Sequence, residues 1–207
     1  MNIVTEHRTA AQHLANVHLS IAGKGQNLAL LALAGAERFS EWRHYPKNDA
    51  RDPVSGRHFF YHAHSADERP ALEHGHFHVF VPSVDGKGYC HLAGIALDAS
   101  GMPLRIFTTN RWVTDEIWCD HSRQVEELDR FHLEMRGRLA PVAAWINAFV
   151  RSYKTEIAEL LNQRDQVVTK LAVAQTLGEI LEDRRFNILS ERRISLLEHL
   201  ADAGLSF

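Results

Sequence analysis

The sequence predicts an α+β fold, in which a four-stranded antiparallel meander sheet (about residues 57–112) packs against N-terminal and C-terminal helices. Apolar residues alternate with polar ones in the middle of the chain, which is typical of strands. Towards both ends apolar residues recur at three- and four-residue steps, which is typical of helices. We expect one domain over residues 1–207, helical at 1–43, sheet-forming at 44–114 and helical at 115–207.

The N-terminal zone reads as two helices. Leu14, Val17 and Ile21 mark one apolar face, "AGKGQN" interrupts the pattern, and a Leu/Ala-rich helix follows. "AGKG" lacks the spacing of a phosphate-binding loop.

Four strands are expected in the middle zone, namely "RHFFYHAH", "GHFHVFVP", "GYCHLAGIALD" and "PLRIFTTNRW". Glycine-containing stretches of hairpin length at Asp85–Gly88 and Asp98–Pro103 separate the last three. An antiparallel meander is the simplest topology for this order. The preceding stretch, residues 41–53, is rich in turn residues and reads as a loop.

The C-terminal zone predicts a series of helices. Pro141 fits the first turn of one of them, and Ser195-x-x-Glu198 resembles a capping box for a short last helix that ends before Gly204. "EDRRFNILSERR" reads as a connection between helices that carries an arginine cluster. The apolar helix faces predict core packing first and, second, a homodimer through the C-terminal helices. The periodic sets run over residues 125–139, 142–160 and 167–181.

Composition and charge exclude several classes of protein. A net charge of −3 and a pI near 6.5 predict no nucleic-acid partner. No apolar run approaches the roughly 20 residues of a membrane span, so we expect no membrane partner. Cys90 and Cys119 form no CxxC motif and no zinc-type pair, and we expect them to be reduced thiols in a cytoplasmic protein.

Histidines are the unusual feature of the middle zone. Residues two apart on a strand share a face, which places His62 with His64 and His76 with His78. If the first two strands pair symmetrically around the loop "SADERPALE", His64 lies opposite His76 and His62 opposite His78. Four imidazoles would then meet on one face, and imidazole nitrogens are good ligands of transition metals. We therefore predict one transition-metal ion, zinc or iron, held by these four histidines.

Two further residues, Glu73 and His91, bear on this site. Glu73 borders the loop and could act as an acid/base or as an additional ligand. His91 begins the third strand, and hairpin geometry predicts Val81 and Asn110 as its neighbours, at the far end of the sheet, so it is left out of the metal set. A metal with an open coordination position predicts a hydrolase or oxygenase that acts on a small molecule.

Several alternatives stay open. The histidines could form a non-catalytic metal- or ligand-binding site, or a polar face that only packs. Asn110 and Arg111, in "TTNRWVTDE", could bind a ligand carboxylate or phosphate. The favoured interpretation of Arg111 is a surface ion pair with Asp115 or Glu116.

"HGHFHVF" is similar to the histidine-triad motif of nucleotide hydrolases and transferases. The resemblance implies that His76 attacks an α-phosphate, flanked by His74 and His78. This sequence departs from the motif at Gly75, where a bulkier apolar residue is usual, and carries it early in the chain. A histidine-triad-like nucleotidyl hydrolase is thus an alternative function.

A broader resemblance covers most of the chain. "HYP" (44–46), "FYHAH" (60–64), "EHGHFHVF" (73–80) and "TTNRWVT" (108–114) resemble an uncharacterised bacterial domain family of unknown function. The resemblance implies a bacterial cytoplasmic protein and no particular activity. The signatures of serine hydrolases, zincins, P-loop and dinucleotide-binding proteins do not occur.

Overall fold

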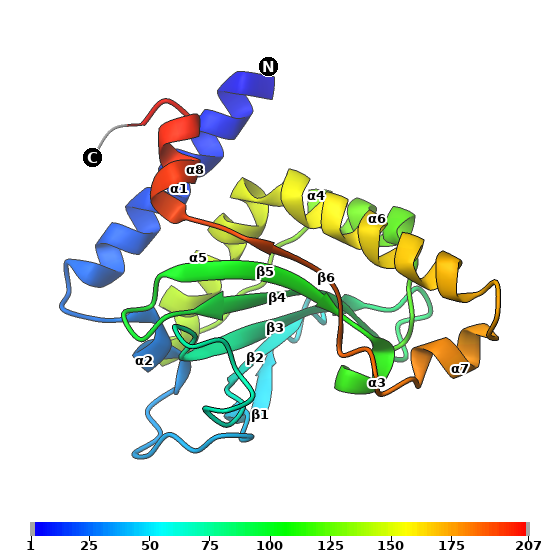
Figure 1. The fold of residues 1–207 in the computed structure, drawn as a ribbon. Helices are drawn as coiled ribbons and strands as arrows, with labels where there is room; N and C mark the ends of the chain where they lie inside the picture. Colours follow the sequence, from blue (N-terminus) through cyan, green and yellow to red (C-terminus); the bar gives the residue numbers. More distant parts are fainter. Residues whose placement is uncertain (1–2, 206–207) are drawn as a thin grey trace.

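The computed structural model describes residues 3–205 and shows one antiparallel sheet of six strands (Figure 1). Their order across the sheet equals their order in the chain. The α+β class and the antiparallel meander are confirmed, but the predicted number of four strands is wrong. The strands are β1 (Tyr45–Arg51), β2 (His58–His62), β3 (Gly75–Pro82), β4 (Tyr89–Leu97), β5 (Pro103–Thr109) and β6 (Ile188–Arg193).

Helices cover one face of this sheet, and the main apolar core lies between the two layers (Figure 1). Phe77 of β3 packs against Trp145 of α5, with ring centroids 6.3 Å apart. Both side chains are fully buried. The helices are α1 (Ile3–Ala22), α2 (Leu28–Ala32), α3 (Arg111–Thr114), α4 (His121–Asp129), α5 (Ala140–Ser152), α6 (Lys154–Leu171), α7 (Leu177–Leu181) and α8 (Leu196–Asp202), with a 3₁₀ turn, η1 (Gly137–Leu139), before α5.

The two strands that the sequence did not predict lie at the edges of the sheet. β1 falls inside the stretch predicted as a loop, and its pairing with β2 shifts register between Tyr45 and Ala50. β6 falls inside the predicted helix connection and pairs with β5 far away in sequence. Edge strands carry polar and charged residues that hide the alternating pattern, as "YPKNDAR" and "ILSERR" do.

Local helix signals were more reliable than helix lengths. Pro141 lies in the first turn of α5, and the Ser195 side chain caps α8 by accepting from the backbone N–H of Glu198, as predicted. The predicted helix over 125–139 is too long, because α4 ends at Asp129. The chain beyond α4 instead bonds to α5, where the Asn147 side chain pairs with both backbone groups of Leu133.

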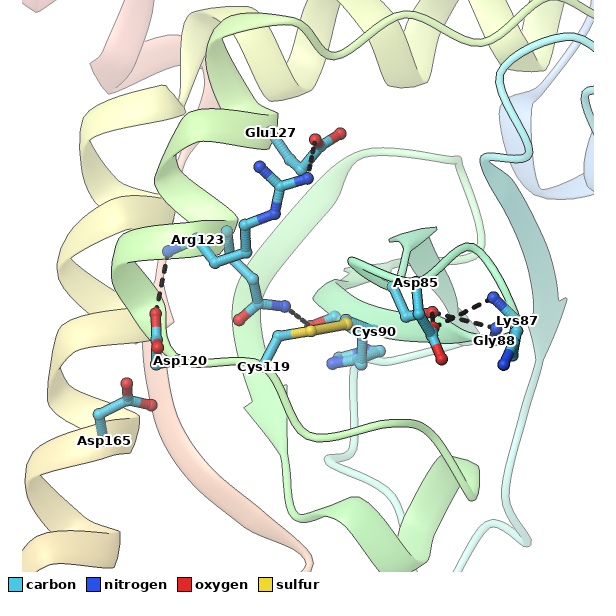
Figure 2. The surroundings of a disulfide bond; sticks show 12 residues. Asp85, Lys87, Gly88, Cys90, Cys119, Asp120, Arg123, Glu127 and Asp165 are labelled. Carbon is cyan, nitrogen blue, oxygen red and sulfur yellow. Dashed lines mark hydrogen bonds and ion pairs between the residues drawn. A yellow bond between two sulfur atoms is a disulfide. The ribbon is translucent and has the colours of Figure 1, made fainter.

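Cys90 and Cys119 form a disulfide, so the prediction of reduced thiols is wrong (Figure 2). Cys90 lies in β4, and Cys119 directly precedes Asp120, whose side chain caps α4. The segment before α4 runs back along β4, because the Ile117 N–H donates to the Tyr89 carbonyl at 2.9 Å. This return places the two Cα atoms 6.0 Å apart. None of the helices within residues 3–205 is long and apolar enough to cross a membrane.

Candidate metal centre

Three buried histidines meet on the face of the sheet that the core helices leave free. They are His62 of β2 and His76 and His78 of β3, called the histidine trio below. One ring nitrogen from each lies within 4.8 Å of the others. Strand alternation explains the arrangement, because Tyr61 and Phe77 point into the core and the trio points away from it.

The strand register differs from the predicted one by two residues. His62 lies opposite His76, and Phe60 lies opposite His78. The predicted pairs of His64 with His76 and of His62 with His78 are therefore wrong, because β2 already ends at His62 and the loop continues from there. A shift by two residues conserves the face, so the prediction that these histidines share one face is confirmed.

His64 lies at the edge of the trio and not within it. Its ring centroid is 5.1 Å from that of His62 and 5.2 Å from that of His76, and its ring stacks on Trp42 at 4.4 Å. Next to it, His44 stacks on Phe60 at 3.7 Å. Trp42 is 55% exposed, so these outer rings form the border between the trio and solvent.

The ring nitrogens of the trio are close enough for a shared cation. Nε2 of His62 and Nε2 of His76 lie 2.7 Å apart. Two nitrogens bound to one zinc at 2.0–2.1 Å with a tetrahedral angle would lie about 3.3 Å apart. A small rotation of either imidazole would open the pair to that distance.

Glu73 bonds to Nδ1 of His76, the ring nitrogen that does not face His62. Its Oε1 accepts from His76 Nδ1 at 2.6 Å, and its Oε2 accepts from Arg105 Nε at 3.0 Å. Burial alone would raise the pKa of Glu73, but the hydrogen bonds and charges of His76 and Arg105 lower it on balance. Both carboxylate oxygens are therefore engaged, and Nε2 of His76 is directed towards His62.

His91 is the residue that the sequence reasoning placed wrongly. The pairing of β3 with β4 shifts register at Val79/Phe80, so His91 lies opposite Phe80 instead of Val81. Its Nε2 lies 2.9 Å from Nδ1 of His78, and its Nδ1 lies 3.1 Å from the hydroxyl of Thr109. A β-bulge adds one residue to a strand and redirects the side chains beyond it, which no sequence pattern revealed here.

Burial favours the neutral form of His62, His78 and His91. It is the largest cause that lowers the pKa of His62 to about 2 and that of His91 to about 3, and it places the pKa of His78 well below its ordinary value. Neighbouring histidines lower the pKa values of His62 and His78 further. A neutral imidazole is the form that binds metals.

The remaining candidate residues lie outside the trio. His74 precedes β3, and its Nδ1 lies 2.8 Å from the Tyr61 hydroxyl. Asn110 is fully buried and donates to the Ile180 carbonyl at 2.8 Å. Arg111 pairs with Glu182 and, at 3.8 Å, with Asp115, which confirms the ion pair expected for it.

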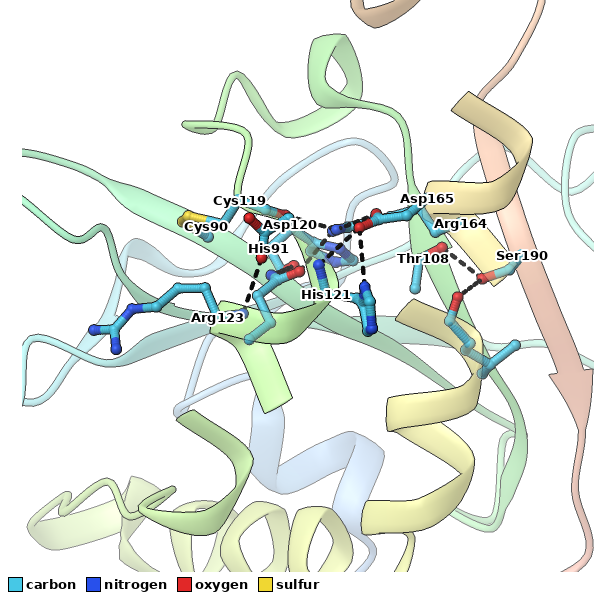
Figure 3. A network of polar contacts seen from close by, with 12 residues as sticks. Cys90, His91, Thr108, Cys119, Asp120, His121, Arg123, Arg164, Asp165 and Ser190 are labelled. Atoms are coloured by element: carbon cyan, nitrogen blue, oxygen red, sulfur yellow. Dashed lines mark hydrogen bonds and ion pairs between the residues drawn. A yellow bond between two sulfur atoms is a disulfide. The ribbon is translucent and has the colours of Figure 1, made fainter. Parts of the chain in front are cut away.

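A buried polar network continues from His91 towards the helices (Figure 3). The Gln124 side chain donates to the His91 carbonyl and accepts from Arg164 Nη1 at 2.7 Å. Arg164, on α6, also donates to the Cys119 carbonyl at 2.6 Å. The network thus connects the strand that carries His91 with α4, α6 and the disulfide.

Comparison with known proteins gives a family but no activity. The family model described as "Domain of unknown function (DUF6969)" matches residues 8–194. No curated protein and no solved structure matches the chain significantly. The match agrees with the resemblance to an uncharacterised family, and it includes the trio, Glu73 and His91. The chain belongs to the DUF6969 family of domains of unknown function.

Proposed function

We propose that this protein binds one divalent transition-metal ion, most suitably zinc, through His62, His76 and His78, and acts as a metal-dependent hydrolase on a small molecule. The observation that carries the proposal is the convergence of three buried imidazoles, one ring nitrogen of each lying within 4.8 Å of the others. Buried polar groups need partners, and three such groups around one point suit a cation better than they suit one another.

The donor set favours zinc over iron. Oxygenases with non-haem iron use two histidines and one carboxylate. Glu73 is the nearby carboxylate, and both of its oxygens are already bonded to His76 and Arg105. The proposed ligands are therefore the three imidazoles alone. Zinc with three protein ligands keeps a position for water, which it activates as a nucleophile.

This chain's own residues would orient the ligands and exclude water. Glu73 holds the Nδ1 proton of His76, so that Nε2 of His76 carries the free lone pair. Phe60 and Phe107 surround the trio, with ring centroids 5.0 Å and 5.8 Å from that of His78. A small molecule would approach past His44 and His64, on the side where Trp42 is exposed.

Metal analysis of untagged, full-length protein tests the proposal, because a histidine tag would itself bind zinc. We expect one zinc per chain after loading and dialysis, and no stoichiometric zinc in His76→Ala or His78→Ala. His74→Ala is the matched control, since His74 belongs to the same motif but bonds to Tyr61 outside the trio. Equal zinc in all four proteins, or none in the unaltered protein, would contradict the proposal.

Three assays on the unaltered protein separate the alternatives. A histidine-triad-like nucleotidyl hydrolase needs no metal. A ring nitrogen of His76 would attack the α-phosphate of a nucleotide and form a P–N (phosphoramidate) bond, while the group beyond the α-phosphate leaves; mass spectrometry detects the nucleotidylated protein. A non-catalytic metal-binding protein would bind zinc but hydrolyse none of a panel of ester, amide and phosphate substrates. The hydrolase proposal requires turnover that a chelator abolishes and added zinc restores.

A further inference from the structure

One buried histidine next to the trio has no part in the proposed coordination. His91 is 1% exposed and lies on the same face of the sheet as the trio. The register shift of β3 against β4 turns its ring towards His78. Bulges beside functional sites commonly redirect a single side chain.

Both ring nitrogens of His91 are engaged, and each bond has a direction. The Nδ1 of His91 faces the Thr109 hydroxyl at 3.1 Å, and the Nε2 faces Nδ1 of His78 at 2.9 Å. When the Thr109 hydroxyl oxygen accepts a hydrogen bond from Nδ1–H of His91, Nε2 of His91 is an acceptor. His78 then donates from Nδ1, and Nε2 of His78 is left with a free lone pair.

The backbone of His91 is fixed as well as its ring. Its carbonyl accepts from the Gln124 side chain, and the buried carboxyl group of Glu116 lies near its N–H. Glu116 and Gln124 are almost fully buried. Ring and backbone are therefore held from β5, from the segment before α4 and from α4, which leaves the imidazole little freedom to turn away from His78.

We infer that His91 is a positioning residue of the metal centre: it accepts a hydrogen bond from Nδ1–H of His78 and, with Thr109, fixes His78 in the tautomer whose Nε2 binds the metal. Glu73 does the same for His76. Ligating histidines usually donate their second ring N–H to such a partner, and its loss typically weakens metal binding 10- to 100-fold. The inference rests on the proposed function.

Zinc affinity, measured by competition with a chromophoric chelator on full-length protein, tests the inference. We expect His91→Leu to weaken zinc binding 10- to 100-fold. His91→Gln keeps an acceptor near the position of Nε2 and should restore most of the affinity. Thr109→Val removes only the outer hydroxyl and should also weaken binding, whereas Thr109→Ser should not.

Two controls separate positioning from general stability. His58→Leu removes another buried imidazole from the same face, one that stacks on Phe80 and not on the trio. It should lower the melting temperature without changing zinc affinity. The Co²⁺-substituted protein gives a second readout, because the visible spectrum reports ligand geometry and should change in His91→Leu but not in His91→Gln.

The outcomes are distinguishable from those of the proposed function. If the unaltered protein binds zinc and both His91→Leu and Thr109→Val bind it equally well, the positioning role is wrong and the metal site stands. If His91→Leu fails to fold, the zinc affinities of Thr109→Val and Thr109→Ser are compared instead. Equal affinities would contradict the positioning role. If the unaltered protein binds no zinc, both proposals are wrong.

Discussion

Two imidazoles of the trio, those of His76 and His78, each bond to a neighbouring residue through Nδ1. For His76 that nitrogen bonds to Glu73, which Arg105 in turn holds. A buried carboxylate beside an imidazole increases the basicity of the ring and fixes its orientation. The orientation and basicity of His76 thus depend on Glu73, which bonds to the ring nitrogen that faces away from His62.

Replacement of Glu73 by Gln tests this at the residue scale. The amide can still accept from His76, but it carries no charge and pairs poorly with Arg105. We expect a zinc affinity about 10-fold weaker, with Glu73→Ala weaker still. Isothermal titration with zinc measures both effects. Unchanged affinity in both variants would show that His76 needs no carboxylate to bind.

Glu116 gives a prediction for pH. Burial is the main cause that raises its pKa from 4.5 to about 8, although the Thr114 hydroxyl and the charge of Arg164 oppose the shift. A folded-state pKa above the unfolded one means that the folded protein binds the extra proton. The associated stability is complete below pH 4.5 and is lost as the pH rises through 8.

We expect the free energy of unfolding to fall between pH 5 and pH 8, by at most about 1.4 kcal/mol per pH unit from this group. Glu116→Gln resembles the protonated form and should flatten that decline. Urea titrations at several pH values measure it. Parallel pH profiles for the two proteins would show that Glu116 is ionised in the fold.

At the scale of elements, Gly94 leaves room for the Phe107 ring, which lies beside the trio. It lies in β4, opposite His78 on one side and Phe107 on the other. A Cβ atom at Gly94 would lie 2.2 Å from Cζ of Phe107. The absence of a side chain therefore lets the Phe107 ring lie across β4, where it also contacts His76 edge-on at 5.2 Å.

Gly94→Ala should consequently displace Phe107 and destabilise the protein by about 1–3 kcal/mol, the usual cost of overpacking. Zinc affinity should fall with it, because Phe107 lies beside two ligands. Gly178→Ala, in α7, is the matched control, since nothing lies within 4 Å of its Cβ position. Chemical denaturation compares the two, and equal stability would mean that Phe107 can move without cost.

Elements also show how far the sequence could predict the site. Strand alternation brought His62, His76 and His78 to one face, and two of the three proposed ligands follow from a single strand. The register did not follow, because the loop after His62 takes up residues that a symmetric hairpin would pair. His91 was missed because its place depends on a bulge, and Arg105 because it reaches Glu73 from β5.

At the scale of the whole molecule, long-range contacts were the least predictable. β6 pairs with β5 although residues 110–187 lie between the two strands in the sequence. Its charged stretch "SERR" gives no apolar pattern that would predict a strand. The Cys90–Cys119 bond joins residues 29 apart, which form neither a CxxC motif nor a zinc-type pair. Both depend on how the C-terminal helices return across the sheet, which local patterns do not encode.

The disulfide closes the segment that carries β5, α3 and one end of the His91 network. A cross-link over 29 residues removes conformational freedom from the unfolded chain and is worth about 3–4 kcal/mol. We expect reductant to lower the free energy of unfolding of the protein by about that amount. Urea titrations with and without reductant measure it directly.

Cys119→Ala provides the matched variant. Cys119 is only partly buried, so its replacement leaves little cavity, and the variant should have the lower stability with or without reductant. Because Arg164 bonds to the Cys119 carbonyl and not to its side chain, the buried network should persist in this variant. Two titratable thiols in the unaltered, unreduced protein, together with no effect of reductant, would show that the cysteines do not pair.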